Sequence, residues 1–365
     1  MIRFYIQTLI RCAVSWGGYF FCALREIFGV VPQSPSKIAI IQLGHLGDIV
    51  LTTPLVLALR EKYPAATIDF LTIAYSKKAA EFLLPENTKI IVYNSGKFSR
   101  GGDHPDEVPG LTDYDVILYI RGDFCLLLNA FKNLKTGFIS CLATRNRLRW
   151  SFLYHIGIPV EYHSRHQYED FKRAADKLLV QLPDSPALEL KSGWTDEFAN
   201  QIGSSPAKYV VVHPGAPWPS RRWPAENFAE ICSFLQREYG LKVVVIGGED
   251  SSVLLSSLGE RHIEHVYIGA SFDFPKLSIL LKNCRLYVGN DSGPAHLAAA
   301  CGVAVIAVYG PEIPEVFGVR GESAISVYGK APCSPCWQTN CIYEQRCLQN
   351  LTVESVLLEI KKLLK

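Results

Sequence analysis

The chain has 365 residues, of which 48% are hydrophobic and 20% charged, so it can bury the cores of about two domains and is not intrinsically disordered. Its formal charge of +2 gives no general attraction to nucleic acid, and we expect no nucleic-acid partner. Its 11 cysteines are an odd number, and several lie in apolar segments, which argues against a secreted disulfide framework and favours a cytoplasmic location.

Residues 1–36 have the pattern of an amphipathic helix. Apolar and aromatic side chains recur at helical spacing, and polar side chains form a stripe four residues apart. The uncharged run from Cys12 to Leu24 is shorter than the roughly 18 residues of a spanning helix, and no small-residue cleavage site follows it. Such a helix can lie in a membrane interface, or it can pack on its own protein or on a sister subunit in a homo-oligomer.

From residue 37, short apolar runs alternate with amphipathic segments, which is the pattern of a parallel sheet covered by helices. A glycine-rich turn, Leu43 to Gly47, connects the first strand to the first helix and places Asp48 in the first helical turn. We therefore expect an N-terminal Rossmann-like domain over residues 37–185. Its predicted strands are residues 38–41, 67–73, 89–93 and 116–120, and its predicted helices are residues 49–63 and 77–84.

A proline-containing segment of mixed polarity, residues 181–192, has the character of a linker, and the alternation then resumes. We expect a second Rossmann-like domain over residues 193–350 and a closing helix within residues 351–365. Ligands of doubly wound folds bind at the carboxyl ends of the strands, which predicts a site in a cleft between two facing domains. The predicted strands of the second domain are residues 209–213, 242–246, 265–268, 285–288 and 304–309.

Residues 290–297 join a predicted strand to a predicted helix through polar, turn-forming side chains. A strand, a short loop and a helix N-terminus present backbone N–H groups and the positive end of the helix dipole to an anion. The Ser292 hydroxyl, the Gly293 amide and the His296 imidazole can approach the same anion. The segment also fits a simple helix cap, with Asp291 or Ser292 as the capping residue.

Two further strand ends of the second domain carry residues suited to a nucleotide. A small-residue loop with Gly215 follows one strand, and the nearby Arg221 and Arg222 can neutralise a diphosphate, although arginines are also common on protein surfaces. Glu249 follows another strand, where a carboxylate can bind both ribose hydroxyls or simply begin a helix. Together with residues 290–297, these strand ends predict a site for a nucleoside diphosphate.

Four motifs in this order resemble glycosyltransferase family 9, the bacterial lipopolysaccharide heptosyltransferase family, over roughly residue 37 to the C-terminus. The motifs are residues 44–54 (GHLGDIVLTTP), 213–216 with 221–224 (HPGA and RRWP), 247–249 (GGE) and 290–296 (NDSGPAH). The resemblance implies a GT-B fold, with an N-terminal acceptor domain and a C-terminal nucleotide-sugar domain. It further implies inverting transfer of a heptose from ADP-heptose to a saccharide of the lipopolysaccharide core, without a catalytic metal.

Inverting transfer needs a base for the acceptor hydroxyl and groups that stabilise the departing diphosphate. The resemblance implies that Asp48 is the base and that Arg221 neutralises the phosphates, whereas Asp291 fixes its loop or caps a helix. The implied donor-binding residues are Arg221, Glu249, Asp291, Ser292, Gly293 and His296, and the supporting residues are Gly47, Gly215 and Arg222.

The chain departs from the family pattern in two places. After residues 310–311 the family often has a small hydroxyl residue and a basic segment, whereas this chain has Glu312-Ile313-Pro314-Glu315, so donor contacts there are not carried over. The N-terminal helix is extra, and it could bring the enzyme to a lipid-linked acceptor at the cytoplasmic face of the inner membrane.

Four cysteines lie close together in the loop of residues 332–347. Cys333, Cys336, Cys341 and Cys347 have the spacing C-x2-C-x4-C-x5-C. Four thiolates this close could bind a structural zinc or iron ion, and the alternatives are free thiols or a disulfide formed on oxidation.

Other functions fit parts of the same pattern. The chain could use another nucleotide sugar or a protein acceptor, or it could be an inactive GT-B-like binding protein that retains a nucleotide site. A Rossmann dehydrogenase is disfavoured, because residues 44–48 do not supply the complete G-x-G-x-x-G turn.

Overall fold

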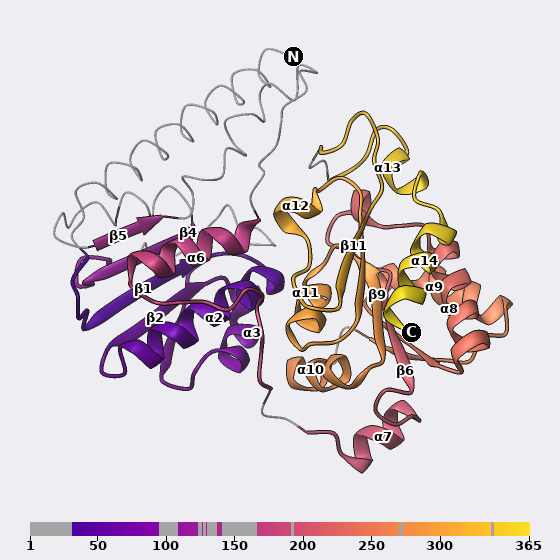
Figure 1. Cartoon of the computed structure of the whole chain (residues 1–365), viewed down its shortest axis with the longest axis horizontal. Helices are drawn as coiled ribbons and strands as arrows, with labels where there is room; N and C mark the ends of the chain where they lie inside the picture. Colours follow the sequence, from indigo (N-terminus) through magenta and orange to yellow (C-terminus); the bar gives the residue numbers. More distant parts are fainter. Residues whose placement is uncertain are drawn as a thin grey trace. The chain divides into compact units, whose positions relative to one another are not determined.

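The computed structural model divides the chain into two compact units, residues 1–183 and 184–365 (Figure 1). The residues it describes are 31–94, 109–122, 126, 129, 137–140, 166–190, 193–269, 273–336 and 339–365. The helix predicted within residues 1–36 falls almost entirely outside this set. The domain boundaries predicted from the sequence remain a prediction, and the two units are described one at a time.

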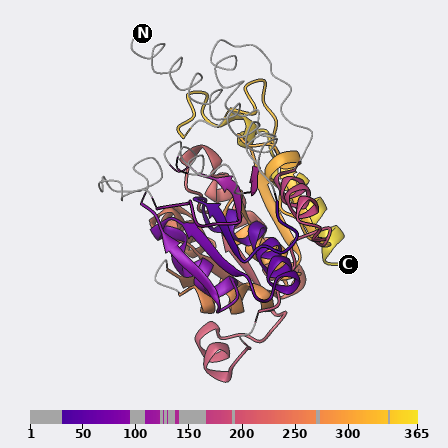
Figure 2. The ribbon, with the colours of Figure 1, turned by 90° about the vertical axis from the view of Figure 1, so that its left-hand side faces the viewer.

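The first unit is built on a five-stranded parallel sheet with the strand order β3-β2-β1-β4-β5 (Figure 2, where this unit faces the viewer). Its described elements are β1 (Lys37–Gln42), α2 (Leu46–Lys62), β2 (Thr67–Thr72), η1 (Ala74–Ser76), α3 (Lys77–Leu83), β3 (Thr88–Val92), β4 (Val116–Arg121), β5 (Gly137–Ser140) and α6 (Gln167–Lys177). Strand β1 lies at the centre because its apolar run is fully buried between β2 and β4.

The strand order of the first unit reverses between β1 and β4. Chain connections from these two strands leave the sheet in opposite directions, and doubly wound folds bind ligands at this topological switch point. The last residues of the two strands, Gln42 and Arg121, are partners across the pair. The side chains that follow β1 and β4 therefore meet where a ligand site is expected.

The second unit has a six-stranded parallel sheet with the order β11-β10-β9-β6-β7-β8, and its switch point lies between β6 and β9. Its strands are β6 (Tyr209–His213), β7 (Lys242–Ile246), β8 (His265–Ile268), β9 (Leu286–Asn290), β10 (Val305–Tyr309) and β11 (Ala324–Tyr328). Its helices are α7 (Asp196–Ile202), η3 (Pro219–Arg221), α8 (Ala225–Tyr239), η4 (Glu249–Ser251), α9 (Ser252–Glu260), α10 (Phe274–Asn283), α11 (Gly293–Ala300), α12 (Pro314–Phe317), α13 (Arg346–Gln349) and α14 (Val353–Leu363).

Helices cover both faces of the second sheet, as its nearly continuous apolar strands require. Because side chains alternate along a strand, Val210 and Val212 belong to the core formed with α8, α9 and α14, whereas the equally buried Val211 points to the opposite face. Helices α10 and α11 lie on that other side (Figure 1).

The buried Trp223 ties three segments of the second unit together. Its backbone N–H donates to the Asn290 side chain at 3.0 Å, and its indole N–H donates to the Leu351 carbonyl at 3.0 Å. Its ring packs edge-on against Phe228 of α8. The loop between β6 and α8 is therefore anchored to the end of β9 and to the segment before α14.

The strands and helices predicted for both halves are present, with ends that differ by up to three residues. Strands β5 and β11 were not predicted; both are short edge strands, and β11 is only partly buried, so its sequence lacks a strong apolar run. Among the described helices, none is long and apolar enough to cross a membrane.

Candidate active site

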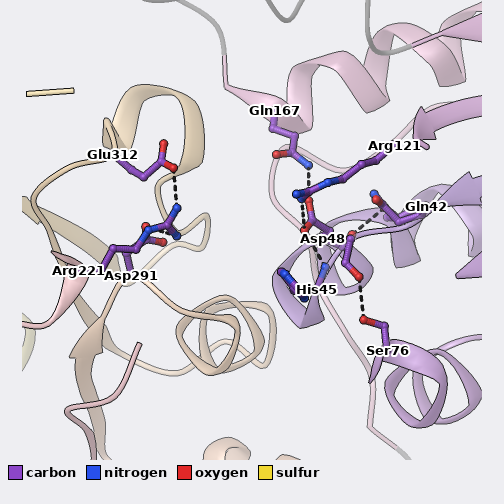
Figure 3. Close-up of polar contacts among 11 residues, drawn as sticks. Gln42, His45, Asp48, Ser76, Arg121, Gln167, Arg221, Asp291 and Glu312 are labelled. Atoms are coloured by element: carbon purple, nitrogen blue, oxygen red, sulfur yellow. Dashed lines mark hydrogen bonds and ion pairs between the residues drawn. The ribbon is translucent and has the colours of Figure 1, made fainter. Parts of the chain in front are cut away.

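Asp48 lies in the first turn of α2, at the switch point of the first sheet, and its side chain is 14% exposed (Figure 3). Its Oδ2 accepts the backbone N–H of His45 at 2.9 Å and Nη1 of Arg121 at 2.9 Å. Its Oδ1 accepts Nε2 of Gln167 at 3.1 Å. Both carboxylate oxygens are engaged by donors from three different segments, so the group has a defined orientation.

The turn before Asp48 requires a glycine because the Asp48 side chain folds back over it. A methyl group at Gly44 would lie 2.5 Å from Cβ, Cγ and Oδ2 of Asp48. The Gly44 carbonyl accepts the Ser76 hydroxyl at 2.7 Å, which ties the turn to η1. Gly47 lies in the first turn of α2, and the supporting role predicted for it stays a prediction.

Asn290 organises the strand ends around the switch point of the second sheet. It is fully buried, and its Nδ2 donates to the Pro214 carbonyl at 2.6 Å while its Oδ1 accepts the Trp223 N–H. The loops after β6 and β9 are thereby held side by side. This contact brings the HPGA and NDSGPAH motifs together, as the sequence predicted for an anion site.

Ser292 and His213 lie in contact across this switch point. The Ser292 hydroxyl donates to the Asn290 carbonyl at 3.0 Å and lies 3.0 Å from Nδ1 of His213. Because the hydroxyl proton is directed to Asn290, Nδ1 of His213 is the donor to Ser292. Burial lowers the pKa of His213 to about 4, opposed by the Asp250 carboxylate and reinforced by Arg222, so His213 is neutral at neutral pH.

Residues 292–296 form the N-cap and the first turn of α11. Ser292 is the N-cap of α11, but its side chain makes no capping bond, and neither does Asp291, which pairs with Arg221 instead. Gly293 is the first helical residue, and His296 is buried in the first turn. Neither the Asp291 nor the Ser292 side chain therefore caps the helix, which was the alternative interpretation of this segment.

Arg221 is held by two carboxylates (Figure 3) and, in addition, by one aromatic ring. Its Nη1 lies 3.0 Å from Oδ2 of Asp291, and its Nη2 donates to Oε1 of Glu312 at 2.5 Å. Its guanidinium carbon lies 4.2 Å from the centre of the Trp218 ring. The Arg221 guanidinium, which is predicted to bind phosphate, is thus oriented before any ligand binds. Its positive charge is compensated by the two acidic side chains.

The remaining predicted residues line the β6 and β7 ends of the same sheet. Arg222 donates through Nε and Nη2 to the Ala216 carbonyl, at 3.1 and 2.9 Å, and lies 3.6 Å from the Asp250 carboxylate. A side chain at Gly215 would collide with that carboxylate. Glu249 is exposed at the start of η4, which is compatible with a ribose ligand but also with a solvated helix start.

Three residues of these clusters were not predicted from the sequence as site residues. Arg121 and Gln167 lie 73 and 119 residues from Asp48 along the chain. Arg121 directly follows a predicted buried strand, so the strand-end argument used for the second domain would have found it. Glu312 was noticed only as a departure from the family pattern, and its pairing with Arg221 has no local sequence signal.

The four cysteines of the 332–347 loop do not form a metal site in the part of the chain that the structure describes. No group of three or more His, Cys, Asp or Glu side chains there is placed to hold a metal ion. Cys341 and Cys347 are free thiols, and the sulfur of Cys341 accepts the backbone N–H groups of Tyr343 and Gln345 at 3.4 and 3.2 Å. The metal site on these four cysteines stays a prediction.

Comparisons with known proteins identify relatives over most of the chain. Residues 112–346, more than half of the sequence, match the model of glycosyltransferase family 9 (heptosyltransferase). Lipooligosaccharide heptosyltransferase 2 of Campylobacter jejuni is 25% identical over 331 residues, which are 88% of this chain and 96% of that protein.

Two solved structures show the same fold. The ADP-heptose lps heptosyltransferase II of Escherichia coli matches with a TM-score of 0.62 and 22% identity, over 90% of this chain and 98% of the other. The iron-containing dodecameric glycosyltransferase TibC of enterotoxigenic E. coli matches with a TM-score of 0.55 and 14% identity, over 90% of this chain and 76% of the other. Together with the two parallel sheets, these matches confirm the predicted GT-B fold.

Proposed function

Because this chain belongs to glycosyltransferase family 9, we propose that it transfers a heptose from ADP-heptose to a saccharide of the lipopolysaccharide core, with inversion at the anomeric carbon. The relatives support the substrates: one is a lipooligosaccharide heptosyltransferase, and another is described as an ADP-heptose enzyme. The observation that carries the proposal is the Asp48 carboxylate, which three donors orient at the switch point of the first sheet.

In the proposed reaction Asp48 takes the proton of the acceptor hydroxyl. The resulting oxygen nucleophile forms a bond to the anomeric carbon of the heptose, and the bond from that carbon to the phosphate oxygen breaks on the opposite side. ADP leaves with the electron pair of that bond. A positioned general base contributes about 10²- to 10⁴-fold to such a step.

The donor would bind at the strand ends of the second unit. Arg221 would bind the diphosphate, together with the Ser292 hydroxyl and the backbone N–H groups at the start of α11, because these groups stabilise the negative charge that develops on the leaving group. His296 in the first helical turn and Glu249 near the ribose complete the proposed donor site. Since a neutral His213 donates to Ser292, the hydroxyl is oriented before the donor arrives.

We propose that the transfer needs no cofactor. A structural metal on the four cysteines would require these side chains to move from their described positions, although the fold relative TibC is iron-containing. Elemental analysis of reduced protein decides the matter: less than about a tenth of an equivalent of zinc or iron would remove the metal hypothesis.

The proposed acceptor is lipid-linked, which places the enzyme at the cytoplasmic face of the inner membrane as a peripheral protein. The N-terminal amphipathic pattern supports membrane contact, and the dodecameric TibC is a precedent for a homo-oligomer. Sedimentation of the full chain with anionic phospholipid vesicles tests the first point, and light scattering on the purified chain tests the second.

The substrates are tested by incubating the purified chain with ADP-heptose and a panel of core saccharides, followed by mass spectrometry of the products. We expect one acceptor to gain one heptosyl residue and calorimetry to show binding of ADP in preference to UDP. Binding of UDP in place of ADP would redirect the proposal to another nucleotide sugar. Binding of ADP without any product would favour a nucleotide-binding protein that has lost transferase activity.

A further inference from the structure

We propose that Arg121 and Gln167 are positioning residues, which hold the Asp48 carboxylate in the orientation that proton removal from the acceptor requires. The proposal rests on the proposed function, because it assigns a role to Asp48. It concerns residues of the first unit that neither the sequence motifs nor the family match single out.

Helix capping explains only one of the contacts that Asp48 makes. A carboxylate in the first turn of a helix commonly accepts the backbone N–H of the residue that precedes the helix, as Oδ2 does from His45 at 2.9 Å. Capping needs neither a cation nor a second side-chain donor. The contacts from Arg121 and Gln167 are therefore additional to what the helix requires.

The two additional donors come from separate elements and reach both carboxylate oxygens. Arg121, the last residue of β4, donates to Oδ2, and Gln167, the first residue of α6, donates to Oδ1. Donors on both oxygens resist rotation of the carboxylate about the Cβ–Cγ bond. Proton transfer depends on this angle, because the accepting oxygen must point at the acceptor hydroxyl.

The surroundings make these contacts stronger than surface contacts. The Asp48 side chain is 14% exposed and that of Arg121 is 26% exposed, so the ion pair is partly shielded from water. Arg121 therefore holds Oδ2 of Asp48 in place more firmly than an exposed side chain would.

Gln167 is itself held in place. It is buried, and the preceding His166 caps α6 by accepting the Tyr168 N–H on its Nδ1 at 3.1 Å. Helix α6 contacts α2, the helix that carries Asp48. The Gln167 amide is therefore presented to Asp48 by a fixed helix start.

Substitutions at the two positions separate positioning from general stability. Arg121→Met removes the cation, Arg121→Lys retains it, and Gln167→Leu removes the amide. Arg60→Met is the matched control, because Arg60 in the same unit joins two segments through the Ala66 and Asn87 carbonyls, at 2.7 and 3.3 Å. Steady-state kinetics with donor and acceptor, ADP calorimetry and thermal unfolding are measured for each variant.

We expect Arg121→Met and Gln167→Leu to lower kcat by about 10- to 100-fold, with KM for both substrates and the Kd for ADP within about threefold of wild type. Arg121→Lys should recover part of the lost kcat. Arg60→Met should lower the Tm and leave kcat unchanged, since its bonds are structural only.

Three results would overturn the proposal. A raised acceptor KM with unchanged kcat would make Arg121 or Gln167 a substrate-binding residue. A loss of kcat in Arg60→Met as large as in Arg121→Met would indicate a structural effect. Wild-type kcat in Arg121→Met and Gln167→Leu, with an inactive Asp48→Ala, would remove the positioning role alone, whereas an active Asp48→Ala would remove the proposed base.

Discussion

Glu312 is expected to weaken the binding of the donor diphosphate, because it competes for Arg221. The side chain is only 2% exposed, and its Oε1 accepts Nη2 of Arg221 at 2.5 Å while Asp291 occupies Nη1. In Glu312→Gln the amide oxygen can still accept from Arg221, so the guanidinium keeps its orientation. The substitution therefore removes one negative charge with little change of shape.

The size of the effect follows from the charge that is removed. A phosphate bound at the guanidinium would lie about 7 Å from the Glu312 carboxylate, and two unit charges at that distance repel by about 1 to 2 kcal/mol at an effective dielectric constant of roughly 20 to 40. Glu312→Gln should accordingly tighten ADP binding by about 5- to 30-fold. The gain should shrink at high salt, because Arg221 is partly exposed.

Isothermal calorimetry with ADP measures this change directly. Glu315→Gln is the matched control, since it removes the same charge three residues further on at an exposed position, and it should leave the ADP affinity within about twofold of wild type. An unchanged or weaker ADP affinity in Glu312→Gln would refute the reasoning, and it would indicate that Glu312 itself binds the donor.

Three further substitutions test the site. Gly44→Ala should lower kcat by at least about tenfold without changing the ADP affinity, because the new methyl group displaces Asp48; equal turnover would contradict the tight turn. Asn290→Ala should lower the free energy of unfolding by about 2 to 4 kcal/mol in urea, because it leaves two buried partners unsatisfied; a loss below about 1 kcal/mol would contradict this. Burial lowers the pKa of His213 from 6.5 to about 4, so between these values the unfolded chain binds the proton first. The free energy of unfolding should fall as the pH decreases from 6.5 to 4, by at most about 1.4 kcal/mol per pH unit, and urea titrations of His213→Gln should lack this component.

Most strands of the two sheets could be predicted from the sequence, because central parallel strands are nearly continuous apolar runs. The runs at residues 38–41 and 209–213 became β1 and β6, which are buried in the structure. The short strands β5 and β11 were not predicted, and β11 is only partly buried, so it needs no continuous apolar run. The strand order, and with it the two switch points, required the structure.

The sequence predicts those residues of the candidate site that follow a predicted strand within one motif. Asp48 and residues 290–296 are of this kind. The partners of Asp48 could not be paired with it, because Gln167 approaches from a helix start 119 residues away. Glu312 was unexpected for a further reason: charged side chains are rarely buried unless they are paired, and the pairing with Arg221 is a property of the fold.

The most direct test of the central claim is the rate of heptose transfer from ADP-heptose by Asp48→Ala, compared with wild type at saturating donor and acceptor. If Asp48 is the base, the variant should lose at least about 100-fold in kcat while its calorimetric affinity for ADP stays within about threefold of wild type. Near-normal turnover by Asp48→Ala would contradict the account, because the oriented carboxylate of the first unit would then have no part in the transfer.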